Sequence, residues 1–178
     1  AIYSSDPNNK LDILHGKQLS YNNYNDIFSA LKISRSFPKN RGTVIVKHAN
    51  PCGVSLLQNN LDSYKSALAC DPISAFGGIV SCNFKITKSI AIELNKIFLE
   101  VVIGNGFDKE SLNLLKSKKN IRVIDASNYL MEENFKINSI NDSFLVQSED
   151  KSLFSKKNFK VVSKKKPSKS QLDDLIFA

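Results

Sequence analysis

A lysine and a histidine stand side by side directly after a strongly apolar run, at the start of segment 47–53, which reads Lys-His-Ala-Asn-Pro-Cys-Gly. His48 can act as a general base near neutral pH, and the positive charge of Lys47 can stabilise a developing negative charge. Successive residues of a strand point to opposite faces, so we expect the turn at Pro51 to bring both side chains to one site. A histidine that only closes a strand end is the alternative, and it stays open at this point.

Two further segments contain residues that could contact a ligand. Segment 74–78 reads Ser-Ala-Phe-Gly-Gly; its paired glycines let backbone approach a ligand closely, and Phe76 could cover a planar ring. A tight turn with a core phenylalanine is the simpler interpretation. Glu100 precedes an apolar run and could accept hydrogen bonds from amine or amide donors, although a glutamate at a strand edge is usually solvated. All three segments are expected beyond the carboxyl ends of strands, where open α/β sheets bind ligands.

The 47–53 segment lacks residues that two other chemistries require. His48 and Cys52 suggest a nucleophilic pair, but the sequence identifies no third group to orient them. The order His-Ala-Asn followed by Pro-Cys resembles half of the zinc-deaminase signature, yet Asn50 replaces the catalytic glutamate and no second cysteine follows at the needed spacing. We therefore predict a site with no zinc and no other metal.

The composition is that of a globular protein with free thiols. The chain has 178 residues, of which 42% are hydrophobic, and three cysteines with no C-x-x-C pair. This pattern, with no signal peptide or membrane-spanning run, predicts a cytoplasmic protein without membrane partners. The net charge is +8, and lysines cluster at 156–157 and 164–166. No aromatic residue interleaves with them as base stacking requires, so we expect a solvated surface rather than a nucleic-acid site.

Helical and β-branched segments alternate along the first two thirds of the chain, which predicts an α/β layered domain with a largely parallel sheet. The expected helices are centred on 27–31 and 61–68, on 87–98 with Thr87 as the N-cap, on 108–115 with Asp108 as the N-cap, and from Ser168 or Ser170 onward. The expected strands are 43–46, 79–82, 101–103, 121–124, 144–146 and 159–162. The first ten residues are expected to be irregular.

Four motifs in this order resemble one known family. They are segments 14–23, 47–53, 71–78 and 100–103. Together they are similar to the bifunctional purine biosynthesis protein, which combines AICAR formyltransferase with IMP cyclohydrolase. The similarity covers nearly the whole chain and is sharpest between Leu14 and Val102.

The resemblance implies a function, a fold and roles for individual residues. It implies transfer of a formyl group from 10-formyltetrahydrofolate to AICAR, by a homodimer with sites at its interface. His48 would be the proton acceptor and Lys47 the group that stabilises the transition state. Nucleotide-binding contacts would fall on Phe76, Gly77 and Glu100, and we add Asn50 as a candidate substrate contact.

The resemblance also implies how the chain is divided. Residues 1–128 would form the first cytidine-deaminase-like subdomain, a three-layer α/β unit with a mixed, largely parallel sheet. Residues 129–178 would be the connecting segment and the start of a second subdomain. The family's arginine motif for the nucleotide phosphate, its cyclohydrolase domain and its folate-binding residues have no match in this chain, so we expect the chain to be inactive by itself. The alternative functions are a basic module that binds nucleic acid and a scaffold that has lost catalysis.

Overall fold

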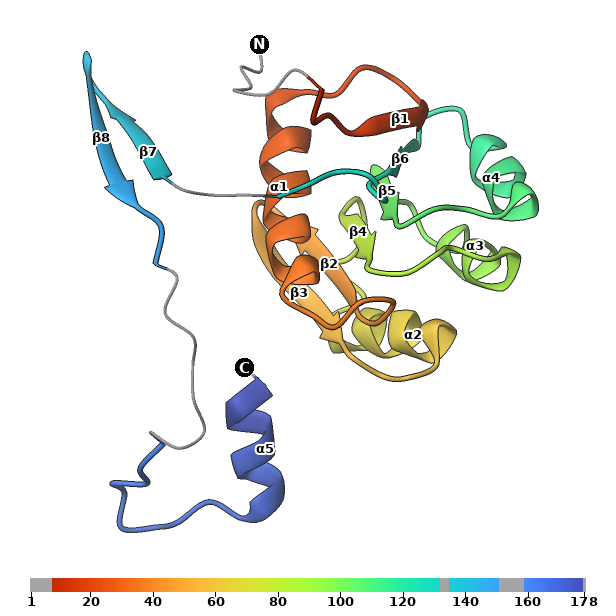
Figure 1. Ribbon diagram of the computed structural model, residues 1–178. Coiled ribbons are helices and arrows are strands. Elements are labelled where there is room, and N and C mark those ends of the chain that lie inside the picture. Colours follow the sequence, from red (N-terminus) through yellow and green to blue (C-terminus); the bar gives the residue numbers. More distant parts are fainter. Residues whose placement is uncertain (1–7, 132–134, 151–158, 178) are drawn as a thin grey trace. The chain divides into compact units, whose positions relative to one another are not determined.

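A mixed six-stranded sheet is the centre of the first part of the chain (Figure 1). The computed structural model describes residues 8–131, 135–150 and 159–177. The strand order is β1-β6-β5-β4-β2-β3. The strands are β1 (Asp12–His15), β2 (Thr43–Lys47), β3 (Asn50–Ser55), β4 (Ile79–Cys82), β5 (Val101–Gly104) and β6 (Arg122–Asp125). Parallel pairing joins β4 to β5 and β5 to β6, whereas β1–β6, β2–β4 and β2–β3 are antiparallel.

Helices cover both faces of this sheet, which gives three layers (Figure 1). One face carries α1 (Tyr21–Arg35), and the other carries α2 (Asn60–Cys70), α3 (Lys88–Leu94) and α4 (Lys109–Lys116). The β-branched residues of the central strands are buried on both faces, as expected for strands between two helical layers. The predicted three-layer α/β fold with a mixed sheet is therefore confirmed.

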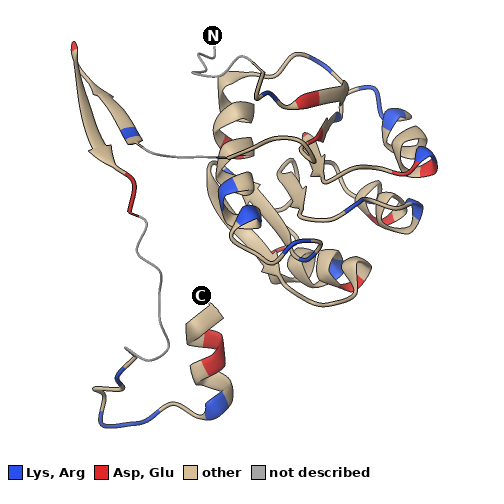
Figure 2. Ribbon diagram, viewed as in Figure 1, with Lys and Arg blue, Asp and Glu red and all other residues tan. Residues whose placement is uncertain are grey.

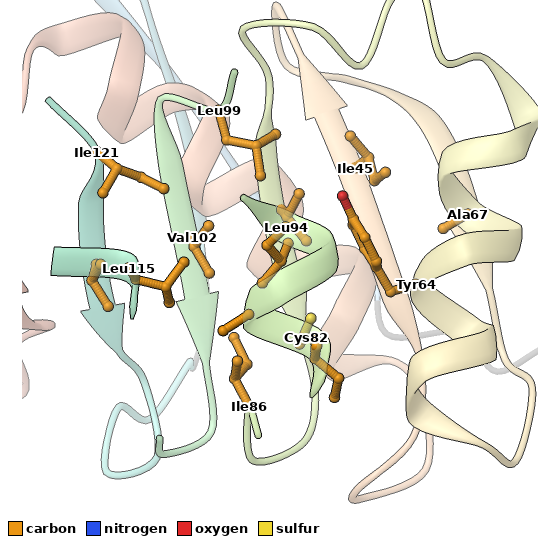
Figure 3. Packing of buried hydrophobic residues seen from close by; sticks show 14 of the residues in the cluster. Ile45, Tyr64, Ala67, Cys82, Ile86, Leu94, Leu99, Val102, Leu115 and Ile121 are labelled. Carbon is orange, nitrogen blue, oxygen red and sulfur yellow. The ribbon is translucent and has the colours of Figure 1, made fainter. Parts of the chain in front are cut away.

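The two hydrophobic cores explain why these strands and helices form. In the core that Figure 3 shows, Ile45 of β2 packs with Tyr64 and Ala67 of α2, and Leu94 and Leu115 belong to the same cluster. The other core lies under α1, where the side chains at i, i+3 and i+4 of one helix face are fully buried; they are Ile27, Ala30 and Leu31. Alternation along each strand sends neighbouring side chains to opposite cores.

The expected helix starts are confirmed at both α3 and α4, but only Asp108 makes the expected cap hydrogen bond. Asp108 caps α4 by accepting the Ser111 N–H at 2.6 Å, as predicted. Thr87 stands at the N-cap of α3 but makes no side-chain cap hydrogen bond. The Asp108 carboxylate accepts the Lys88 N–H instead, at 3.0 Å. Helix α3 ends at Leu94, so the prediction that it continues to Phe98 is wrong.

Four strand assignments also need correction. The sequence pattern predicts neither β1 nor β3, which lie at the edges of the sheet, nor the strand over Phe135–Ile140. The prediction of a strand over 159–162 is wrong, because the structure has no strand there. The irregular start falls mainly on residues 1–7, which lie outside the described residues.

The chain has two compact units, residues 1–131 and residues 132–178. The second unit contains a hairpin of β7 (Phe135–Ile140) and β8 (Ser143–Ser148), and the helix α5 (Lys169–Phe177). Ser168 caps α5 as predicted, since its hydroxyl accepts the Gln171 N–H at 3.2 Å. No described residue of this unit is buried, and the lysines at 164–166 are exposed. They lie in the blue stretch of ribbon that precedes α5 (Figure 2). The assignment of the two units to family subdomains stays a prediction.

Among the described helices, none has the length and apolar character needed to span a membrane.

Candidate functional site

The segment that contains Lys47 and His48 is a β-hairpin rather than a loop. Lys47 pairs with Asn50, so the reversal consists of His48 and Ala49 alone. Both have left-handed backbone, with φ of 55° and 60°. Two-residue reversals of this kind match the right-handed twist of the strands they join. The expectation that the chain turns at Pro51 is therefore wrong, because Pro51 already belongs to β3.

Side chains on both sides hold this turn. The Asp26 carboxylate of α1 accepts the Ala49 N–H at 2.7 Å and the His48 N–H at 3.3 Å. Asn50 donates its side-chain amide to the His48 carbonyl at 2.9 Å. The turn is thus fixed through its backbone, and the exposed His48 imidazole is left to face solvent.

Lys47 and His48 open on the same surface depression. Its volume is about 600 Å³. The lining residues are Lys47, His48, Asn50, Pro51, Cys52, Asp71 and Ser74. Lys47 and His48 thus line one depression, as we expect from the sequence.

Lys47 connects the turn to the Phe-Gly segment. Its Nζ donates to the Phe76 carbonyl at 2.7 Å. Gly77 follows with φ of +73°, and its N–H donates to the Phe98 carbonyl at 2.8 Å. The Phe76 ring lies 5.4 Å from the Phe98 ring and is 59% exposed. The interpretation of Phe76 as a core residue is therefore wrong, and its ring is available to a ligand.

Glu100 does not line the depression, but it lies at the same end of the central strands. It precedes β5, and β4 separates that strand from β2. The Glu100 N–H donates to the Gly78 carbonyl at 3.0 Å, and its carboxylate accepts the Asn23 side-chain amide at 2.8 Å. Asn23 is buried on α1. Glu100 is thus a half-buried, bonded group, and the interpretation of a solvated strand-edge glutamate is wrong.

These residues gather where strands of opposite direction meet. Because β2 is antiparallel to β4, with Val46 opposite Ile79, the end of β2 lies beside the start of β4. Residues 76–78 and Glu100 therefore precede β4 and β5, both in sequence and in space. The expectation that all three segments lie beyond carboxyl ends holds only for Lys47 and His48.

Three further polar residues line the depression, namely Cys52, Asp71 and Ser74. Asp71 accepts the Ser74 hydroxyl at 2.6 Å and the Ser74 N–H at 2.9 Å, and these bonds lower the pKa of its carboxyl group. Burial and the nearby Asp71 charge raise the pKa of the Cys52 thiol. That thiol donates to the Ile45 carbonyl at 3.6 Å rather than to His48. A proton-bearing thiol turned toward backbone agrees with the rejection of a cysteine nucleophile.

Asp71 and Ser74 lie within the 71–78 motif, which is the signal that could have identified them. Asp26 has no such signal, since it is one polar residue on the surface of α1. Within residues 8–131, 135–150 and 159–177, no three His, Cys, Asp or Glu side chains are grouped so that they could hold a metal ion.

Comparison with known proteins identifies the family. The chain matches the family of the AICARFT/IMPCHase bienzyme over residues 1–178. The chain belongs to this family, which confirms the resemblance found in its motifs.

Curated relatives carry the name bifunctional purine biosynthesis protein PurH. The chain is 43% identical to the protein from Acetivibrio thermocellus and 44% identical to that from Caldicellulosiruptor bescii, in each case over 93% of this chain and 32% of the relative. It is 40% identical to the protein from Aquifex aeolicus, over 95% of this chain and 33% of that relative. The chain thus spans about a third of the length of these relatives.

Proposed function

We propose that this chain supplies the catalytic pair of an AICAR formyltransferase, which transfers a formyl group from 10-formyltetrahydrofolate to AICAR in purine synthesis. The observation that carries the proposal is the pair itself: Lys47 and His48 are adjacent at a two-residue turn and line one depression. Family membership supports the choice of reaction, since both activities of the bienzyme are named in the family.

His48 acts as the general base. The 5-amine of AICAR is a weak nucleophile because its lone pair is delocalised into the ring and the carboxamide. Attack on the formyl carbon becomes easier when a base removes a proton from this amine. The His48 side chain is exposed at the depression, and its backbone is already held by Asp26, so the imidazole can reach a bound amine.

Lys47 stabilises the negative charge of the tetrahedral intermediate. An ammonium group has three donors, and one of those of Lys47 is directed to the Phe76 carbonyl. The other donors can reach the oxyanion that forms when the amine attacks. The Phe76 bond orients the ammonium before the substrate arrives, so less reorganisation is needed in the transition state.

The neighbouring residues bind the nucleotide. The exposed Phe76 ring is suited to cover the planar imidazole of AICAR. The backbone at Gly77 allows close approach, Asn50 presents a polar side chain at the depression, and Glu100 has acceptor capacity beyond its bond to Asn23.

The complete enzyme requires more than this chain. Because the chain spans about a third of its relatives, we propose that the formyl donor and the nucleotide phosphate are bound by segments matching the other two thirds, within a cytoplasmic homodimer. The same protein would also carry the IMP cyclohydrolase activity of the family.

The test compares the two histidines of the chain in the natural gene product that carries it. His48→Ala should lower kcat for formyl transfer by about 10²-fold to 10⁴-fold, the usual contribution of a general base, while AICAR affinity measured by calorimetry stays within about three-fold. The matched control is His15→Gln. That histidine lies in β1, where its ring contacts the Lys118 carbonyl at 3.3 Å. Full turnover in His48→Ala would overturn the assignment of the base.

A further inference from the structure

We propose that Asp26 is a positioning residue for His48 and acts through the backbone of the turn, an inference that rests on the function proposed above. Asp26 does not line the depression. Its carboxylate instead bridges two successive N–H groups, those of His48 and Ala49. We infer that this bridge sets where the imidazole stands over the site.

The turn needs such support because its residues do not favour their own conformation. Left-handed backbone is adopted readily by glycine and sometimes by asparagine or aspartate, and two-residue hairpin turns accordingly prefer Asn-Gly. The turn of this hairpin has a histidine and an alanine instead, at positions 48 and 49. A charged acceptor that receives both amides offsets this disfavoured backbone, since bonds to a carboxylate are stronger than neutral ones.

Helix α1 holds the other side of the site in the same way. Asn23 lies three residues before Asp26 and so on the same helix face, and it donates to Glu100 at 2.8 Å. The helix is anchored on the sheet by Ile27 and Leu31, which are fully buried. One rigid helix therefore sets the separation between the His48 turn and Glu100.

A misplaced base affects the chemical step more than binding. A displacement of about 1 Å in a catalytic group can lower the rate on the order of 10²-fold. Asp26 touches only backbone N–H groups at the turn, so its loss should move His48 without removing a ligand contact. We therefore expect the effect in kcat and little effect in KM.

The kinetic test uses Asp26→Ala in the natural gene product. The kcat for formyl transfer should fall at least about ten-fold while KM for AICAR stays within about three-fold, because only positioning is lost. In Asp26→Asn, which keeps one acceptor oxygen, kcat should fall less. The matched control is Asn25→Ala, the exposed neighbour on α1, which should keep the kcat of the parent protein.

A rescue experiment separates positioning from general damage to the fold. Ala49→Gly makes the left-handed conformation accessible without Asp26. Added to Asp26→Ala, it should restore kcat by about three-fold or more, whereas sucrose, an osmolyte that stabilises the whole fold, should restore nothing. Equal rescue by sucrose would mean that Asp26→Ala acts only through overall stability, and the proposal would be wrong.

Hydrogen exchange tests the bridge without relying on turnover. In Asp26→Ala the amides of His48 and Ala49 should exchange at least about ten-fold faster, since their acceptor is gone, while those of β4 stay unchanged. If kcat and exchange are both unchanged, the positioning role is wrong even if His48→Ala is inactive. If His48→Ala remains active, the proposed function fails and the positioning role with it; faster exchange would then establish only that Asp26 holds the turn.

Discussion

Two antiparallel hairpins in the described part of the chain, β2–β3 and β7–β8, have the same loop length but depend on different features. Each reverses in two residues, His48-Ala49 in the first and Asn141-Asp142 in the second. In the exposed hairpin the left-handed residue is Asn141, with φ of 53°, a residue type that tolerates this conformation. In the site hairpin a histidine and an alanine adopt it, at φ of 55° and 60°.

The difference lies in what surrounds each turn. The β2–β3 turn is held by a carboxylate from α1, and β3 presses closely on α2. All residues of β7 and β8 are exposed, so that hairpin relies on its own sequence. Disfavoured backbone that persists because its surroundings enforce it is typical of functional sites. On the function proposed above, His48 stands in this turn for its chemistry, and the conformation of the turn comes from tertiary contacts.

The largest expected effect tests the close approach of β3 to α2. A Cβ atom at Gly53 would stand 2.0 Å from the Ala67 carbonyl, so Gly53→Ala forces strand and helix apart. Overpacking of this kind should lower the free energy of unfolding by about 3 kcal/mol or more, measured by urea unfolding followed by circular dichroism. The matched variant Asn138→Ala, on exposed β7, should change it by less than about 0.5 kcal/mol. Equal effects would mean that the site hairpin is not held by α2.

A smaller effect tests the left-handed turn itself. Ala49→Gly should raise the free energy of unfolding by roughly 0.5–1 kcal/mol, because glycine removes the penalty of left-handed backbone but adds entropy to the unfolded chain. Asn141→Gly should be neutral within about 0.5 kcal/mol, since asparagine already tolerates this conformation. Urea unfolding followed by the amide NMR signals of each hairpin gives both values. If Asn141→Gly raised the free energy of unfolding more than Ala49→Gly, the proposed difference between the two turns would be wrong.

The same contrast explains which parts of the fold the sequence could predict. Buried β-branched runs identify β2, β4, β5 and β6, because a strand between two helical layers is apolar on both faces. Strand β3 begins Asn-Pro-Cys-Gly, residues mostly depleted in strands. It is tolerated because it is an edge strand with a bulge, in which Val46 pairs with Pro51, Ile45 pairs with Gly53 and Cys52 is left between them.

The residues of the candidate site also differ in whether the sequence could predict them. Adjacent Lys47 and His48 are visible in the sequence because their chemistry belongs to their side chains. The role of Asp26 is not visible, because it depends on a contact across 22 residues to backbone groups that carry no sequence signature. The short apolar run 159–162 shows the opposite error, since a strand also needs a partner strand, which a local pattern does not reveal.

The smallest expected effect is on how the stability of the fold changes at acid pH, and it involves Asp71 and Ser74 of the depression. The Ser74 hydroxyl and N–H lower the pKa of Asp71 from its ordinary value of 3.8. A carboxyl group whose pKa is depressed in the folded state stabilises the fold above its unfolded pKa, and this contribution is lost as the pH falls through the folded pKa. Ser74→Ala removes the hydroxyl bond, so the pKa of Asp71 should rise toward its ordinary value. The midpoint of urea unfolding should then differ less between pH 7 and pH 3 than it does in the parent chain.

The control for this effect lies in the second hairpin. The Ser143 hydroxyl stands 3.4 Å from Asp142 Oδ1, compared with 2.6 Å for Ser74 and Asp71. Hydrogen bonds weaken with length, so Ser143→Ala should leave the difference between the two midpoints unchanged. NMR titration of the Asp71 carboxyl carbon with and without Ser74 measures the pKa directly. An unshifted titration in Ser74→Ala would mean that the backbone N–H alone sets this pKa.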